Sequence, residues 1–464
     1  MRELREKAEA ADGVATAAML SLIEASAQLR DRKLSSLELT AICLQRIAEL
    51  NPQLNAFITV TEDLAREQAR QVDREIAAGG WRGPLHGIPI ALKDLIDVTG
   101  VRTTAASRQF PERIARHDAV IVAKLKTQGA VILGKTNLHE FAFGGSGVIS
   151  AFGVVRNPWD VTRITGGSSS GSAAAVAAGM CLAAIGTDTA GSIRTPAALC
   201  GIVGHRPSAG VWKAEGIIPL RPSFDTVGPM ARTVADARIL LQALSDNLPA
   251  AHVPVSHLRI GIAREGFFDD LDAEVAANVQ HAIDVLASLF VSVRDVSVQV
   301  KTHWSSFDGE ILAYHQAMLD ASPELYLRGT RARLMACVEP SPSEYQVAQS
   351  ALAAERRAAL KTFEVVDVVV TPTTVVPAPL IADLQPMSTT SLRAYEVEYL
   401  LRNTGPFSLL YWPSVSVPCG FTSAGLPIGM QISARPGADD LALQVAQAYE
   451  QATAWHQRVP PTAR

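Results

Sequence analysis

The chain has 464 residues, of which 48% are hydrophobic and 19% are charged, and its formal net charge is −4. This composition is typical of a folded globular protein with enough apolar residues for a large core, and it excludes general disorder. Basic residues are scattered along the chain rather than clustered, so we expect no nucleic-acid partner.

The cysteines and the start of the chain bear on location. The five cysteines lie far apart and form no C-x-x-C pair, which indicates buried reduced thiols rather than disulfides or a zinc site. The first residues, MRELREKAEA, lack the basic and then apolar pattern of a secretory signal. No uncharged apolar run reaches the ~18 residues of a membrane span. We therefore expect a cytoplasmic protein without membrane association.

Helical and strand patterns alternate along the chain. Residues 1–80 are predicted to be helical, because apolar residues recur at helical spacing and Gly79 and Gly80 end the second of two helices. Further on, short apolar segments bounded by glycine or proline predict buried strands, and longer periodic segments predict helices. The predicted strands lie in 87–100, 130–136, 258–263, 291–298, 365–374 and 412–421, and the predicted helices in 118–129, 272–290 and 441–455.

This alternation predicts an α/β fold with a buried, largely parallel sheet. The sequence shows no internal repeat and no low-complexity linker, so we expect one large domain over residues 1–464. Residues 296–345 are helical and irregular in pattern, and they are a candidate cap over an active site.

A serine-rich turn, RITGGSSSGSAAAVAAGM at 163–180, is the first chemical signal. A flexible linker is excluded because the turn runs directly into an alanine-rich helical segment. A phosphate-binding loop is excluded because Ser172 and Ala173 stand where that motif requires lysine and a hydroxyl. Residues 167–171 also match G-x-S-x-G, but the turn-forming NPWDVTR precedes them instead of the strand that a nucleophile elbow needs.

A second serine turn, GTDTAGSIRTPAALCG at 186–201, contains Ser192 after a run of small residues. Successive backbone N–H groups in such a turn can point at one spot and bind an oxyanion. On its own, however, a serine in a glycine-rich turn is more often structural.

Three motifs in order strengthen the chemical interpretation: GIPIALKD with Lys93, GGSSSGSAAA with Ser168, and the turn with Ser192. Together with NPW at 157–159, DTVGPMARTVADA at 225–237 and SVSVPCGF…GLPIGMQI at 414–432, the chain resembles the amidase signature family over nearly its whole length. The resemblance implies a single α/β/α domain around a twisted mixed sheet, with no metal and no organic cofactor.

The resemblance also implies a Ser–cis-Ser–Lys triad. Ser192 corresponds to the nucleophile, Ser168 to the bridging serine with a cis peptide bond to Gly167, and Lys93 to the base. Lys93 can accept a proton only when it is neutral, so its pKa must fall by roughly three units from about 10.4. The apolar segment GIPIALK supplies surroundings that could lower this pKa.

Residues near the two serines are assigned supporting roles by the same resemblance. The backbone N–H groups of 189–192 (Thr189, Ala190, Gly191 and Ser192) would form the oxyanion hole. Ser169, Asp188 and Arg194 would hold the surrounding loops, and the scattered histidines are treated as structural.

Two segments are candidates for the substrate pocket. Tyr411 and Trp412 either narrow the substrate channel or pack against the cap. The loop 141–152 is the other candidate wall, and its apolar, uncharged composition predicts an uncharged aryl or apolar substrate. The pocket residues proposed from this loop are Phe143, Gly144, Gly145 and Ile149.

We therefore expect a freestanding hydrolase of small amides, anilides or carbamates, which the resemblance suggests could be a homodimer. The alternative is the amidase component of a glutamine-dependent tRNA amidotransferase, which needs partner subunits. Components of that type usually carry an aspartate in a Y-x-x-D-x-F/Y-T stretch, and AYEVEYLLRNTGPFS at 394–408 does not reproduce it. A catalytically inactive binding protein is a third, remote alternative, against which the intact triad argues.

Overall fold

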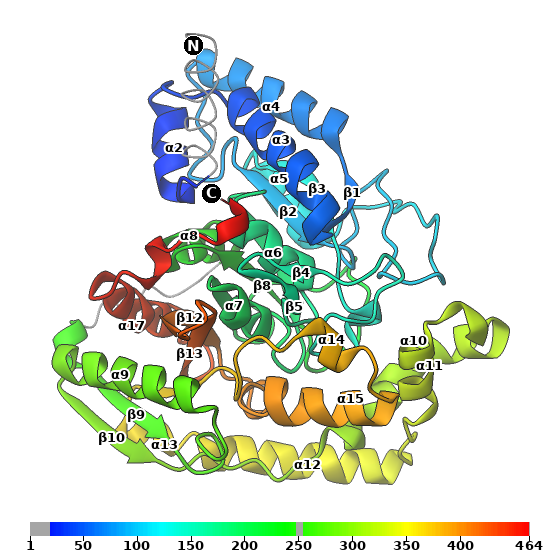
Figure 1. Cartoon of the computed structure of the whole chain (residues 1–464), viewed down its shortest axis with the longest axis vertical. Coiled ribbons are helices and arrows are strands. Elements are labelled where there is room, and N and C mark those ends of the chain that lie inside the picture. Colours follow the sequence, from blue (N-terminus) through cyan, green and yellow to red (C-terminus); the bar gives the residue numbers. More distant parts are fainter. Residues whose placement is uncertain (1–18, 247–253, 464) are drawn as a thin grey trace.

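A computed structural model describes residues 19–246 and 254–463. In this described part, eleven strands form one sheet in the order β1-β3-β2-β6-β8-β7-β12-β13-β11-β9-β10 (Figure 1). Their bounds are β1 (Phe57–Val60), β2 (Pro89–Lys93), β3 (Val131–Thr136), β6 (Ala183–Asp188), β7 (Val203–Arg206), β8 (Thr226–Ala231), β9 (Arg259–Ala263), β10 (Ser292–Val296), β11 (Val368–Pro372), β12 (Ser414–Phe421) and β13 (Pro427–Ala434). A separate hairpin pairs β4 (Arg156–Asn157) with β5 (Asp160–Ile164).

The predicted α/β fold with a large mixed sheet is confirmed. Parallel pairing occurs towards both ends of the sheet, in β3–β2–β6 and in β11–β9–β10. The other neighbours, including the central run β6–β8–β7–β12–β13–β11, are antiparallel, which the expectation of a largely parallel sheet did not include. Tight turns such as the one between β12 and β13 can join only antiparallel strands, whereas parallel neighbours need a crossover connection.

Helices pack on the sheet and at both ends of the molecule. Several begin with a capping box, such as Ser35 with Glu38 and Ser341 with Glu344, which satisfies the free N–H groups of the first turn. The α-helices are α2 (Leu22–Arg30), α3 (Ser36–Leu54), α4 (Glu62–Ala77), α5 (Val120–Thr127), α6 (Ser170–Ala177), α7 (Arg194–Cys200), α8 (Val234–Leu244), α9 (Ala273–Leu289), α10 (Asp308–Ala321), α11 (Arg328–Met335), α12 (Pro342–Ala359), α13 (Thr362–Val365), α14 (Ile381–Leu384), α15 (Thr389–Tyr395), α16 (Gly405–Leu409) and α17 (Asp439–Gln451).

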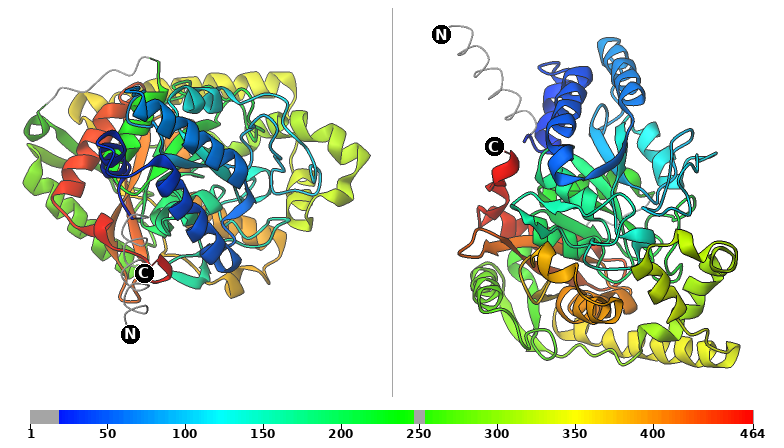
Figure 2. Two further views of the ribbon diagram at one scale, coloured as in Figure 1. Left: turned by 90° about the horizontal axis from the view of Figure 1, so that it is seen from above. Right: turned by 45° about the vertical axis from the view of Figure 1, so that its right-hand side comes forward.

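The helices divide into a sheet-covering set and two end groups. α6 packs on β2, β3 and β6, while α9 and α17 pack on β12 and β13. α2, α3 and α4 lie at one end of the molecule, and α12 lies across the opposite end (Figures 1 and 2). The prediction for residues 1–80 is confirmed for the helices α2–α4, except that β1 lies between α3 and α4; residues 1–18 lie outside the described part.

The segment 296–345 contains the short helix η3 (Trp304–Phe307), α10 and α11. Its helical and irregular character is as expected, while the single-domain boundary at 1–464 and the function of this segment as a cap remain predictions. In the described ranges, no helix is both long and apolar enough to cross a membrane. The five cysteines are free thiols, and only Cys337 is partly exposed.

Candidate active site

Three elements bring the predicted triad residues together. Lys93 is the last residue of β2, which pairs in parallel with β6, so both strands end on the same side of the sheet. The Nζ of Lys93 donates hydrogen bonds to Ser168 Oγ and to Thr187 Oγ1, both at 2.7 Å. The peptide bond between Gly167 and Ser168 is cis, as the family resemblance implied. A lysine and the bridging serine are therefore in direct contact at the sheet edge.

The surroundings of Lys93 favour its neutral form. The side chain is fully buried, and burial lowers its pKa from 10.5 to about 7, although Asp225 and Asp188 partly oppose this shift. At pH 7 about half of the molecules then carry a neutral lysine, against fewer than about one in a thousand for an unperturbed one. The structure thus agrees with the shift that a catalytic base requires. Asp94, the next residue in sequence, pairs with Lys135 at 2.9 Å.

Ser192 lies next to Ser169 of the first serine-rich turn. The backbone N–H of Ser169 donates to the carbonyl of Ser192 at 3.1 Å, which ties the two serine-rich turns together. The hydroxyl of Ser169 donates to the carbonyl of Thr187 at 3.1 Å and therefore supports the strand end that contacts Lys93. Ser192 keeps 6% of its surface exposed, so its hydroxyl can be reached from the adjoining cavity.

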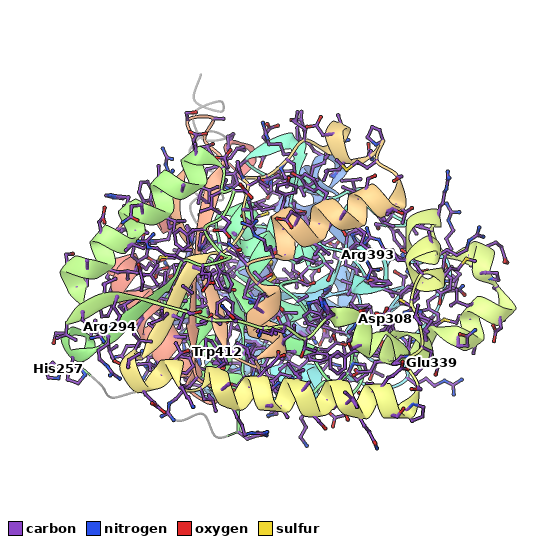
Figure 3. The ribbon with its side chains drawn as sticks, turned by 90° about the horizontal axis from the view of Figure 1, so that it is seen from below. His257, Arg294, Asp308, Glu339, Arg393 and Trp412 are labelled. Atoms are coloured by element: carbon purple, nitrogen blue, oxygen red, sulfur yellow. The ribbon has the colours of Figure 1, made fainter. Side chains whose placement is uncertain are left out.

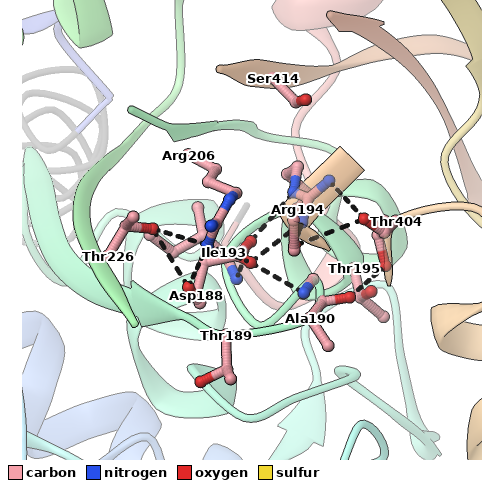
Figure 4. A network of polar contacts seen from close by, with 12 residues as sticks. Asp188, Thr189, Ala190, Ile193, Arg194, Thr195, Arg206, Thr226, Thr404 and Ser414 are labelled. Atoms are coloured by element: carbon pink, nitrogen blue, oxygen red, sulfur yellow. Dashed lines mark hydrogen bonds and ion pairs between the residues drawn. The ribbon is translucent and has the colours of Figure 1, made fainter. Parts of the chain in front are cut away.

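An ion-pair network holds the turn between β6 and α7 (Figure 4). Asp188 accepts hydrogen bonds from the backbone N–H of Gly191 at 2.8 Å and of Ile193 at 3.2 Å, and it pairs with Arg194 at 3.0 Å. Burial alone would raise the pKa of Asp188, but the charges of Arg194 and Arg206 outweigh it and hold the pKa well below its ordinary value. The expected supporting positions of Asp188 and Arg194 are thus found in the structure.

This network bears on the predicted oxyanion hole. Gly191 adopts a φ of +139°, a backbone conformation that favours glycine, and its N–H is already bonded to Asp188. Among the described residues, none accepts a hydrogen bond from the N–H groups of Thr189, Ala190 and Ser192. These three donors are therefore available for an oxyanion, whereas Gly191 shapes the turn.

A cavity of about 510 Å³ opens beside Ser192. Phe143 and Gly144 line it as predicted, whereas Gly145 and Ile149 belong to the same loop but are not among its lining residues. The cap candidate contributes Val300, His303, Trp304 and Arg333 to the lining. The cavity is not the uncharged pocket that loop 141–152 suggested, because its walls also include Arg221, Arg333, Arg393, Arg402, Glu396 and Glu398.

Tyr411 and Trp412 do not line this cavity, contrary to the pocket prediction. Trp412 is fully buried and packs against Phe363 and Phe407, with ring centroids 4.5 and 5.7 Å away. The ring of Tyr411 lies under the guanidinium of Arg356 on α12, 3.3 Å from its centroid. The alternative, packing against the cap candidate, is closer to the structure, because Tyr411 lies in an apolar cluster with Phe307 and Trp412 in one with Val298.

Two polar residues beside the triad were missed from the sequence. Thr187, which hydrogen-bonds Lys93, lies in GTDT, and Asp225 opens the DTVGPMA motif. Asp225 accepts a hydrogen bond from the hydroxyl of Thr189 at 2.5 Å and therefore braces the oxyanion turn. Both residues lie within the motifs quoted above, so their position in these motifs could have indicated that they lie near the triad.

A family model described as Amidase matches residues 38–443. The chain belongs to the amidase family. The amidase structures that it resembles include one titled "Crystal structure of amidase", 32% identical with a TM-score of 0.85, covering 93% of this chain and 99% of that one. The peptide amidase from Stenotrophomonas maltophilia is 30% identical with a TM-score of 0.83, covering 96% and 98%. These matches confirm the family and the fold class.

The chain is also similar to curated proteins that share one name. The A subunit of glutamyl-tRNA(Gln) amidotransferase from Nostoc punctiforme is 37% identical over 95% of this chain and 99% of its own. The corresponding protein of Geobacter metallireducens is 38% identical over 94% and 98%. These relatives are subunits of an enzyme that is named for its tRNA. The expectation of no nucleic-acid partner, which was deduced from the scattered basic residues, was therefore wrong. One component can belong to such an enzyme without a basic face of its own.

Proposed function

We propose that this amidase-family hydrolase cleaves the C–N bond of an amide through an acyl-enzyme on Ser192. The observation that carries the proposal is the 2.7 Å contact between Ser168 and a buried Lys93 whose pKa is lowered to about 7. A serine hydroxyl becomes an effective nucleophile only when a base accepts its proton, and this pair supplies the base and the relay.

In the proposed first half-reaction, neutral Lys93 accepts the Ser192 proton through Ser168 while Ser192 attacks the amide carbon. The N–H groups of Thr189, Ala190 and Ser192 would stabilise the oxyanion, and one such donor is typically worth 10²–10³ in rate. When the C–N bond breaks, the proton returns through Ser168 to the departing amine. Water then attacks the acyl-enzyme by the same relay and releases the acid.

The amide of glutamine is the substrate candidate that the curated relatives favour, with this chain acting as the amidase component of a tRNA amidotransferase. Identity of 37% over nearly the whole of both chains supports it, and the charged cavity suits a substrate with charged groups. The missing Y-x-x-D-x-F/Y-T stretch at 394–408 argues against it.

A freestanding hydrolase of aryl or apolar amides, anilides or carbamates is the second candidate. The apolar part of the cavity supports it, since Phe143, Leu220, Val300, Trp304 and Pro406 can contact a flat apolar group. We also propose that residues 296–345 act as the cap of the site, because four of them line the cavity.

The test measures ammonia release from glutamine and nitroaniline release from an acyl nitroanilide by the purified chain, with Ser192→Ala as control. Release that the variant abolishes supports the Ser192 mechanism, and the faster substrate indicates the subgroup. Equal release by the variant would refute the proposed nucleophile. If neither substrate is cleaved, glutamine is retested with the partner subunits of a related amidotransferase, and failure there would refute the glutamine candidate.

A further inference from the structure

Four arginines line the cavity beside Ser192, and three of them have a carboxylate partner. The pairs are Arg221 with Asp308 at 2.6 Å, Arg333 with Glu396 at 2.8 Å, and Arg402 with Glu398 at 2.8 Å. Arg393 of α15, labelled in Figure 3, is the fourth. No ion pair or hydrogen bond joins its guanidinium to any residue that the structure describes. Its guanidinium carbon lies 5.2 Å from the ring centroid of Phe143, which also lines the cavity.

Burial of Arg393 disfavours its charged form. Burial lowers the pKa of its guanidinium, and so do the charges of Arg333 and Arg221, whereas Cys337 and Asp308 act in the opposite direction. A partly buried cation without a partner is unfavourable, and an anion placed beside it relieves that penalty. Unused donors lie in the same wall: within the described chain, Nε and Nη2 of Arg333 and Nε of Arg221 are buried without a hydrogen-bond partner.

Asp308 is the carboxylate that acts on Arg393, but it is already paired with Arg221 at 2.6 Å. Glu396 is taken up by Arg333 and also accepts the N–H of Ser146 at 3.1 Å. His139, next to Glu396, stays neutral because burial lowers its pKa to about 3. His303 is exposed at the cavity rim. With the three ion pairs cancelled, the wall presents one excess positive charge.

We propose that the substrate is an amide that carries a carboxylate, and that Arg393 binds this carboxylate. A carboxylate matches the single excess charge, and the planar guanidinium can donate two parallel N–H bonds to its oxygens. The substrate class rests on the proposed amide hydrolysis, but binding to Arg393 does not. Ser192 and Arg393 line the same cavity.

The first test compares glutaramate with pentanamide, which has a methyl group where glutaramate has its carboxylate. For glutaramate, Arg393→Gln is expected to lower kcat/KM by about 10- to 100-fold, as for loss of a hydrogen-bonded charge. For pentanamide the change stays within about twofold, because the lost charge has no partner there. Arg393→Lys should retain part of the kcat/KM for glutaramate, since lysine keeps the positive charge but lacks the planar guanidinium that donates two parallel N–H bonds. Arg331→Gln, which replaces an exposed arginine of α11, is the matched control and leaves both substrates unchanged. An equal effect of Arg393→Gln on both amides would overturn the proposal.

The second test separates this proposal from the proposed reaction. Calorimetry measures glutaramate binding to the Ser192→Ala protein, with and without Arg393→Gln. Binding that weakens about 10- to 100-fold with Arg393→Gln supports the carboxylate site even if no amide is hydrolysed. Equal binding of glutaramate and pentanamide, or no effect of Arg393→Gln, would overturn it even if Ser192-dependent hydrolysis is observed.

Discussion

The pKa of Lys93 makes a quantitative prediction about the pH dependence of Ser192 reactivity. Only neutral Lys93 can accept the proton, and its pKa of about 7 means that reactivity follows the fraction deprotonated at that value. From pH 5 to pH 7 the rate should rise about 50-fold, and from pH 8 to pH 10 only about 1.1-fold. A lysine with the ordinary pKa of 10.5 would instead give about a 75-fold rise between pH 8 and pH 10.

The assay follows covalent labelling of Ser192 by an uncharged sulfonyl fluoride, measured as intact mass against time at each pH. It needs no knowledge of the natural substrate, and Ser192→Ala controls for labelling elsewhere. A plateau above pH 8 agrees with a desolvated base. A rate that keeps rising to pH 10, or one that is independent of pH, would refute the assignment of Lys93 as the base at this pKa.

Three further variants test the structure. Lys93→Met should abolish labelling. Between pH 7 and pH 9 the unfolded wild-type lysine binds more protons than the folded one, so urea titrations should show wild-type stability rising by about 2 kcal/mol relative to the variant. Parallel pH dependences of the two proteins would contradict the lowered pKa of Lys93. Gly191→Ala places a Cβ in steric overlap with Thr404 Oγ1, so kcat should fall by about 10²–10³. An unchanged kcat would show that this turn tolerates a side chain at position 191. Trp412→Ala should lower the free energy of unfolding by about 3–5 kcal/mol in thermal unfolding and leave the ratio of the hydrolysis rates of two amides unchanged. An altered ratio would indicate that Trp412 contacts the substrate.

Much of the fold follows from local patterns. α9 and α17 show helical apolar spacing, and the apolar segments that became β2, β3 and β9 are short and bounded by glycine or proline. β6, with the sequence AAIGTD, gave no such signal because nearly all its residues are small or polar although each is buried. Such a strand is stabilised by the adjacent strands and by the residues packed on both faces of the sheet. The sequence of the strand itself carries no signal of these contacts.

The residues proposed for catalysis could be located from the sequence because each lies in a short motif whose backbone conformation depends on neighbouring residues. Lys93 ends an apolar strand, and Ser168 and Ser192 lie in turns of small residues. The cavity wall was not predictable in this way. Loop 141–152 alone suggested an uncharged pocket, whereas Arg221, Arg333 and Arg393 reach the cavity from distant parts of the chain.

The sequence by itself determined the family and the α/β class, and it located the motifs that contain Lys93, Ser168 and Ser192, because these depend on local patterns and periodicity. Only the tertiary structure decided the antiparallel centre of the sheet, the burial of Trp412 and the unpaired charge of Arg393. The physical reason is that strand pairing, side-chain burial and charge matching are properties of residue pairs that meet only when the chain folds.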